Sequence, residues 1–257
     1  MSEAGGRKSE IESPISNLKC PNFFTIKPQN CSLPMWKVDL HAHTVYSKDS
    51  LTPTRALIER ARQRGLDRIA VTEHNRLDGA LAAKRLAPEL VIVGEEIKTT
   101  HGEIIAYFVQ EMVPRGLSPQ ETIARLREQG AVISIPHPLD TLRGSALGLE
   151  NVLAIIDQVD ALEVRNARCV RRQDNLAAAE LAAAHGKLVT AGSDAHIPFE
   201  VGACYLEMPP FEDNAESFRR SLAQARPAGV ESPFWPHLAS TYAKWRKRIA
   251  PVKISEQ

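Results

Sequence analysis

The amino-acid sequence predicts an α/β fold in which about seven strand–helix units close into a barrel. First, short apolar segments alternate with helical patterns from Trp36 onward, in units of about 25–35 residues, which is the length of a strand with its crossover helix. Second, histidines and carboxylates follow the ends of several of these apolar segments. Alternation of this kind implies right-handed crossovers and a parallel sheet, and about seven units favour a closed barrel over an open sheet.

Strands are expected where short runs of apolar, often β-branched residues are bounded by polar residues, proline or glycine. In chain order the expected strands are Lys37–His43, Arg68–Thr72, Leu90–Val93, Gly102–Val109, Ala131–Ile135, Ala161–Val164, Leu188–Ala191 and Cys204–Met208.

Helices are expected where start and stop residues frame a helical pattern. Thr52-Pro53 begins the first helix, with proline at the first helical position, and Gly65 ends it. The capping-box sequence Ser118-Pro119-Gln120-Glu121 begins the third. The helices after the first are expected at Asp78–Leu86, Ser118–Gln129, Leu149–Val159, Arg171–His185, Asn214–Gln224 and Leu238–Ile249.

The length of 257 residues fits one large domain, which we expect to span residues 36–257, including the C-terminal helix. Residues 1–35 differ from the rest, because they are polar, contain four prolines and show neither helical nor strand periodicity. We expect an irregular N-terminal extension there.

Composition and charge narrow the classes of partner. Hydrophobic residues make up 43% and charged residues 25%, as in an ordinary globular protein. The net charge of +1 gives no general reason to expect nucleic acid or a membrane, so any phosphate affinity must come from a local site. The four cysteines form no C-x-x-C pair, and neither a secretory signal nor an apolar run of membrane-spanning length is present. We therefore expect a cytoplasmic protein without a membrane partner; the sequence carries no signal for an oligomeric state.

Five of the eight histidines lie at or just after an expected strand end, and three carboxylates join them. In an α/β barrel the carboxyl ends of the strands open onto one face, which holds the active site. Residues far apart in sequence are therefore expected to converge at one mouth. These eight residues are His41, His43, Asp49, His74, Glu96, His137, Asp194 and His196.

Each motif alone has an ordinary structural interpretation as a polar loop or a rigid turn. In His41-x-His43 the two rings share one side, because side chains two apart on a strand do so. In Pro136-His137-Pro138 two prolines fix the backbone around one imidazole. Gly192-Ser193-Asp194-Ala195-His196 repeats the two-apart spacing with a carboxylate, beside a glycine that permits close approach. Their common position at strand ends indicates a metal site.

The candidate ligands are imidazoles and carboxylates without thiolate, a set that suits manganese, zinc or iron. Eight ligands are too many for one tetrahedral ion, so we expect two to three divalent metal ions. Ions held close together can bind a phosphoryl group, lower the pKa of water and stabilise a leaving oxygen. The reaction class indicated is metal-assisted hydrolysis.

In order along residues 36–209, these motifs resemble the PHP (polymerase and histidinol phosphatase) domain superfamily. The motifs are Asp39-Leu40-His41-Ala42-His43, Asp49, Thr72-Glu73-His74-Asn75, Gly94-Glu95-Glu96-Ile97, Pro136-His137-Pro138 and Gly192-Ser193-Asp194-Ala195-His196. The resemblance implies a distorted seven-stranded (β/α) barrel and a metal-dependent phosphoesterase.

The resemblance also implies a ligand set for each metal. The first set is His41, His43, Glu96 and Asp194; Glu96 bridges to a second metal shared with His137; Asp49, His74 and His196 form the third set. The implied nucleophile is a metal-bridging hydroxide in this multinuclear site, with an acid or base role for Asp194 or His196.

Two positions depart from the family pattern. Glu73 stands where many members have aspartate, and the extra methylene is expected to affect a contact behind His74 rather than His74 itself. Glu103 stands where many members place a histidine ligand of the second metal. We regard Glu103, or His101 two residues earlier, as a possible replacement ligand; the alternative is that both are polar residues of the rim.

The substrate indicated is a phosphate ester, such as a small phosphorylated metabolite or a nucleotide. Arg143, Arg165 and Arg168 lie near the expected mouth and are candidates to hold its phosphate, with Asn166 beside them. Alternatives are a phosphodiesterase or exonuclease acting on short oligonucleotides, and a non-catalytic metal-binding interaction module. The last helix carries Lys244, Arg246, Lys247 and Arg248, which we interpret as a solvated face, so nucleic acid is possible but not favoured.

Overall fold

A computed structural model describes residues 34–232 and 236–250 of the chain. The expected N-terminal extension, residues 1–35, lies outside the described residues except for its last two.

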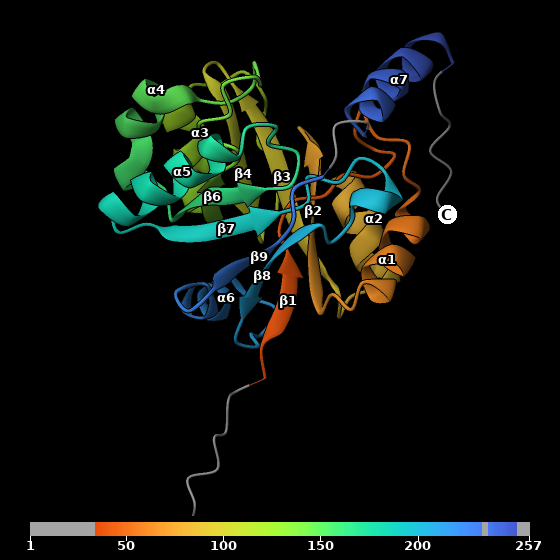
Figure 1. The fold of residues 1–257 in the computed structure, drawn as a ribbon, viewed down its shortest axis with the longest axis horizontal. Coiled ribbons are helices and arrows are strands. Elements are labelled where there is room, and N and C mark those ends of the chain that lie inside the picture. Colours follow the sequence, from red (N-terminus) through yellow and green to blue (C-terminus); the bar gives the residue numbers. More distant parts are fainter. Residues whose placement is uncertain (1–33, 233–235, 251–257) are drawn as a thin grey trace, which may run out of the picture. The chain divides into compact units, whose positions relative to one another are not determined.

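The nine strands in the described part of the chain form one mixed sheet, in the order β7-β6-β5-β4-β3-β2-β1-β8-β9 (Figure 1). They are β1 Trp36–Asp39, β2 Arg68–His74, β3 Val91–Thr99, β4 Gly102–Tyr107, β5 Val132–Ile135, β6 Ala161–Asn166, β7 Leu188–Gly192, β8 Cys204–Met208 and β9 Arg226–Gly229.

The segment that follows β1 meets the end of β7 and nearly closes the sheet into a barrel. The amide of Leu40 donates to the carbonyl of Ala191 at 3.1 Å, and that of His43 to Ala195 at 2.9 Å. Gly192 permits this approach, because a Cβ atom at Gly192 would lie 2.3 Å from the Cβ atom of His41. The expectation of an α/β barrel is thus confirmed: β1 to β7 form the barrel, and β8 and β9 add an antiparallel extension beside β1.

The expectation of a parallel sheet is wrong at β4, which pairs antiparallel with both β3 and β5. Strand β3 continues to Thr99 instead of ending at Val93, so only Thr100 and His101 connect it to β4. A parallel crossover needs a dozen or more residues, whereas two residues can only form a hairpin.

Seven α-helices lie in the described part of the chain: α1 Thr54–Gln63, α2 Asp78–Leu86, α3 Pro119–Glu128, α4 Gly148–Ile155, α5 Arg172–Ala184, α6 Ala215–Leu222 and α7 Pro236–Ile249. The expected capping box is present at α3, where the Ser118 hydroxyl accepts from the Glu121 amide and the Glu121 carboxylate accepts from the Ser118 amide. None of the helices among these residues has the length and apolar character needed to cross a membrane.

Candidate metal centre

The carboxyl ends of β1, β2, β5 and β7, together with β3 and the loop after β1, bring all eight predicted residues into one cluster at the mouth of the barrel. Seven of them are buried, and the side chain of His74 is only 13% exposed. The backbone at His137 (φ 31°) and at Asp194 (φ 51°) is left-handed, a conformation that costs a non-glycine residue about 1–3 kcal/mol. Such strain is typical of side chains that are held for a function.

The first group of ligand atoms lies at the centre of the mouth. The Nε2 atoms of His41 and His43 are 3.1 Å apart. Each lies 3.3–3.5 Å from Glu96 Oε2 and 3.4–3.5 Å from Asp194 Oδ1.

A second group lies beside it. His74 Nε2 is 3.3 Å from one carboxylate oxygen of Asp49, and His196 Nε2 is 3.4 Å from the other. His43, His74 and His196 also lie close enough to share one ion. This group adjoins the first one, because His74 Nδ1 lies 3.0 Å from Glu96 Oε2.

The third group contains Glu103 and shares Glu96 with the first. His137 Nε2 is 3.2 Å from Glu96 Oε1 and 3.8 Å from Glu103 Oε2. His74 Nδ1 is 3.9 Å from the other oxygen of Glu103. His101 does not join this group, because it occupies the exposed turn between β3 and β4, where its ring contacts the Thr100 hydroxyl.

Three carboxylate oxygens in this cluster, Asp49 Oδ1, Glu96 Oε2 and Asp194 Oδ1, are buried without a hydrogen-bond partner in the described chain. A buried carboxylate is costly unless positive charge compensates it. Histidine ring nitrogens lie 3.0–3.5 Å from each of these atoms. The donor set and its unsatisfied oxygens therefore fit divalent metal ions.

The charges of the cluster change the pKa values of its members. Burial lowers the pKa of His41, but the carboxylates of Asp194, Glu163 and Glu96 outweigh it and raise that pKa well above its usual range. Burial raises the pKa of Glu96, but His74 and His41 outweigh it and hold that pKa well below its usual range. The carboxylates thus draw positive charge to the mouth.

Hydrogen bonds behind the rings fix which nitrogen of His43 faces the centre. The Ser47 hydroxyl donates to the buried carboxylate of Glu73, which can only accept. The same hydroxyl accepts from the His74 amide at 3.0 Å and lies 3.1 Å from His43 Nδ1. Its two acceptor positions are therefore filled by that amide and by the N–H at Nδ1. His43 Nε2 then keeps a lone pair toward the centre.

His41 and His196 are oriented in the same way. His41 Nδ1 lies 3.0 Å from Glu163 Oε1, and His196 Nδ1 lies 2.8 Å from the carbonyl oxygen of Asp194. The supporting roles of Ser47 and Glu163 were missed by sequence reasoning. The signal for Glu163 was a carboxylate in an otherwise buried strand.

The four candidate substrate contacts lie in different places. Arg143 lines a cavity of about 470 Å³ over the cluster, and its Nη1 donates to Asp194 Oδ2 at 2.6 Å. Arg168 lines the same cavity and donates to the Ser240 hydroxyl of α7. Asn166 is buried and donates to the carboxylates of Glu163 and Asp194, so it supports the cluster from behind.

Arg165 is not brought to the mouth. Its guanidinium donates to the carbonyl of Gly229 at 2.7 Å, next to β9, and lies 3.7 Å from the Glu231 carboxylate. A bulge in the pairing of β6 with β7 falls between Glu163 and Arg165, so simple alternation along the strand does not place this side chain.

Among the basic residues of α7, which we interpreted as a solvated face, Lys244 and Arg248 are exposed, whereas Arg246 and Lys247 are half-buried. Lys244, Lys247 and Arg248 line a second cavity beside the metal centre. The side chain of Arg246 donates to the carbonyl of Ala250, the residue after the end of α7.

A nearly closed α/β barrel with imidazoles and carboxylates converging at its mouth defines the class of metal-dependent hydrolases. Within that class the chain belongs to the PHP domain family: the model of the PHP domain matches residues 39–199, and that of a PHP-associated region matches residues 172–227.

The chain is 38% identical over 174 residues to the uncharacterized protein MJ0417 of Methanocaldococcus jannaschii, a match that covers 66% of this chain and 70% of that protein. A two-domain protein of Bacteroides vulgatus containing a predicted PHP-like metal-dependent phosphoesterase has the same fold (TM-score 0.65, 19% identity, 77% of this chain and 66% of that one). The lesion-specific endonuclease EndoQ of Pyrococcus furiosus is also similar (TM-score 0.52, 16% identity, 77% of this chain and 59% of that one).

Proposed function

We propose that the protein hydrolyses a phosphate ester, such as that of a small phosphorylated metabolite or nucleotide, with two to three divalent ions of manganese, zinc or iron. The observation that carries the proposal is the cavity of about 470 Å³, because it joins members of the metal cluster to two arginines, Arg143 and Arg168. A phosphate in this cavity would meet metal ligands and guanidinium groups together.

We assign the three groups of ligand atoms to three proposed ion sites. His41, His43, Glu96 and Asp194 would hold one ion; Glu96, His137 and Glu103 a second; Asp49, His74 and His196 a third. When bound, the ions would bind phosphoryl oxygens, lower the pKa of water and stabilise the leaving oxygen. A carboxylate at Glu103 in place of imidazole favours an ion that prefers oxygen ligands, such as manganese, in the second site.

Side chains of the protein orient the ester. Arg143 is fixed between Asp194 and Asp140, which holds its positive charge at the cavity wall. His196 lines the cavity, whereas Asp194 Oδ2 already accepts from Arg143. We therefore place the leaving oxygen on the His196 side of the cavity, where water supplies its proton.

The alternative of a non-catalytic metal-binding module is disfavoured by the same cavity. A structural metal site is closed by its ligands, whereas a catalytic site keeps a position open. Here Asp49, His74, Glu103 and His196 all line open space.

The test begins with chelator-stripped protein that is reloaded with manganese, zinc or iron. Its hydrolysis of p-nitrophenyl phosphate, bis(p-nitrophenyl) phosphate and a nucleotide panel is then measured. We expect metal-dependent turnover that His137→Ala abolishes with folding retained. His185→Ala, which changes an exposed histidine outside the cluster, is the matched control. Absence of turnover on every ester by metal-loaded protein would refute the proposal.

A further inference from the structure

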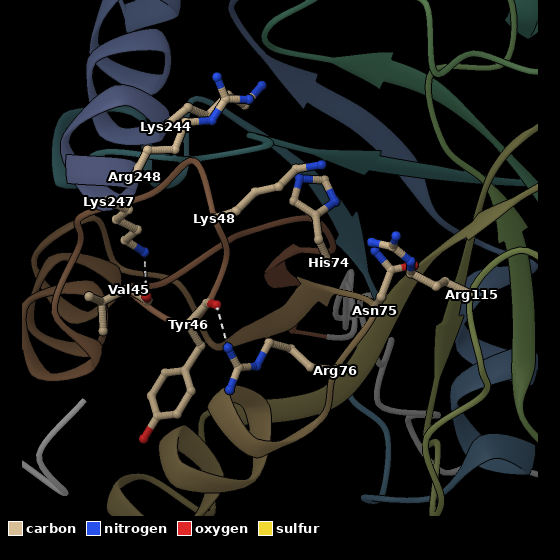
Figure 2. A pocket seen from close by; sticks show the side chains of 10 residues that line it. All are labelled: Val45, Tyr46, Lys48, His74, Asn75, Arg76, Arg115, Lys244, Lys247 and Arg248. Carbon is tan, nitrogen blue, oxygen red and sulfur yellow. Dashed lines mark hydrogen bonds between the residues drawn. The ribbon is translucent and has the colours of Figure 1, made fainter. Parts of the chain in front are cut away.

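A second cavity of about 750 Å³, which we call the basic cleft, lies beside the metal centre (Figure 2). Its walls come from the loop after β1, the segment after β2, the segment after β4 and helix α7. Six cationic side chains line it: Lys48, Arg76, Arg115, Lys244, Lys247 and Arg248. Since the whole chain has a net charge of only +1, this concentration of positive charge is local.

The cations of the basic cleft are only partly neutralised. Arg76 pairs with the carboxylate of Asp78, Lys244 lies 3.4 Å from the carboxylate of Asp49, and Lys247 donates to the carbonyls of Val45 and Ser47. Lys48, Arg115 and Arg248, by contrast, are exposed and have neither a hydrogen bond nor an ion pair from their side chains to the described part of the chain. These three are available to an anionic ligand.

The basic cleft is continuous with the metal centre. Lys48, His74 and Lys244 line both the basic cleft and the cavity over the cluster. Figure 2 shows the side chains of Lys48 and His74 directed into the same space. One ligand can therefore place a phosphate at the metal centre and extend into the basic cleft.

Helix α7 forms a wall that the family match does not account for. The two family models end at residues 199 and 227, before α7 begins at Pro236. The helix is nevertheless attached to the mouth, since Lys247 donates to carbonyls of the loop after β1 and Ser240 accepts from the buried Arg168. A helix fixed there with three cations facing the cleft is suited to ligand selection.

The number and spread of the charges distinguish between ligands. Arg143 and Arg168 are enough to contact a single phosphate in the cavity over the cluster. The cations of the basic cleft would then contact further phosphates, which a chain of nucleotides supplies at regular intervals. Tyr46 lines the same cleft, with the Arg76 guanidinium 5.3 Å from the centre of its ring, and an aromatic ring among cations is typical of sites where unpaired bases stack. A cavity of this size suits a small ligand or a few nucleotides, not a duplex.

We propose that the basic cleft binds the backbone of a short single-stranded oligonucleotide whose scissile phosphate lies at the metal centre, a proposal that rests on the proposed function. Hydrolysis breaks one P–O ester bond and forms a P–O bond to the oxygen of water. One product keeps the terminal phosphate, and the other leaves as an alcohol that takes a proton from the water.

Binding can be measured without turnover by fluorescence anisotropy of a fluorescein-labelled hexanucleotide with the full chain in excess chelator. Each phosphate contact to a single strand contributes about −0.7 to the slope of log K against log salt concentration. Three available cations therefore predict a slope of about −2. The variant Arg115→Ala/Arg248→Ala is expected to reduce the slope by about 1.4 and to weaken binding at least tenfold. Arg62→Ala/Arg220→Ala, which removes two exposed arginines of α1 and α6, is the charge-matched control.

The outcomes separate this inference from the proposed function. Hydrolysis of small esters without oligonucleotide binding would overturn the inference and leave the function standing. Oligonucleotide binding without hydrolysis of any ester would support oligonucleotide binding in the basic cleft and refute the proposed hydrolysis of a phosphate ester. Equal binding of a duplex, equal competition by inorganic polyphosphate, or an unchanged slope in Arg115→Ala/Arg248→Ala would each overturn the assignment to single-stranded nucleic acid.

Discussion

The substitution Glu73→Gln tests whether the hydrogen bonds behind His43 set its metal affinity. Glu73 is buried, and its carboxylate accepts from the amide and hydroxyl of Thr44 and from the hydroxyl of Ser47. Glutamine keeps the shape but replaces one acceptor oxygen with an NH₂ donor. If the NH₂ group faces Ser47, the Ser47 hydroxyl must turn its proton toward His43 Nδ1. The ring then carries its proton on Nε2 and loses the lone pair that faces the centre.

The opposite orientation of the glutamine is also unfavourable. Its NH₂ group would then face the amide N–H of Thr44, which cannot turn away. Loss of one hydrogen bond to a charged acceptor, with a buried donor left unpaired, costs about 2–4 kcal/mol of folding free energy. Changes of this kind behind a metal-binding histidine reduce metal affinity about 10–100-fold, which corresponds to about 1.4–2.7 kcal/mol.

The assay is competitive metal titration against a chromogenic chelator, combined with urea unfolding of the metal-free protein. Glu180→Gln, at an exposed position of α5, is the matched control and should change neither quantity. A metal affinity for Glu73→Gln within threefold of the parent would refute the reasoning. If that normal affinity came with a large loss of stability, the carboxylate would serve only the fold.

Three further predictions follow from other parts of the structure. Gly192→Ala should destabilise the fold by about 3 kcal/mol in urea unfolding, because its Cβ atom would overlap His41. Chelation should lower the Tm in calorimetry, because the buried carboxylates lose their counter-charge; an unchanged Tm would contradict the metal assignment. Burial raises the pKa of the Cys204 thiol to about 12, from about 9, so its thiolate fraction at pH 8 falls about a thousandfold. Peptide-level mass spectrometry should therefore find Cys204 unalkylated until the protein unfolds, and rapid labelling of native protein would show that the thiol is accessible.

The predictable part of the site was the part attached to strand ends. His41, His74 and His137 each follow or end an apolar run, and parallel topology brings such positions to one mouth. Glu103 entered through a family motif, and the structure places it beside His137.

The unpredictable parts depend on contacts between segments distant in sequence. A bulge in β6 directs Arg165 toward β9, and no local pattern marks a bulge. The position of α7 follows from bonds such as that from Lys247 to the loop after β1, so its cations have the same sequence signature as a solvated face.

The hydrogen bonds between the segment after β1 and the end of β7 join parts of the chain about 150 residues apart in sequence, and both sides of this seam carry candidate metal ligands. His41 and His43 lie on one side, and Asp194 and His196 on the other. The first metal group is therefore complete only after the barrel has closed. A bound ion would link the two sides of the seam, because its ligands come from both. Slow hydrogen exchange at the amides of Leu40 and His43 would then report whether the two sides of the seam are joined.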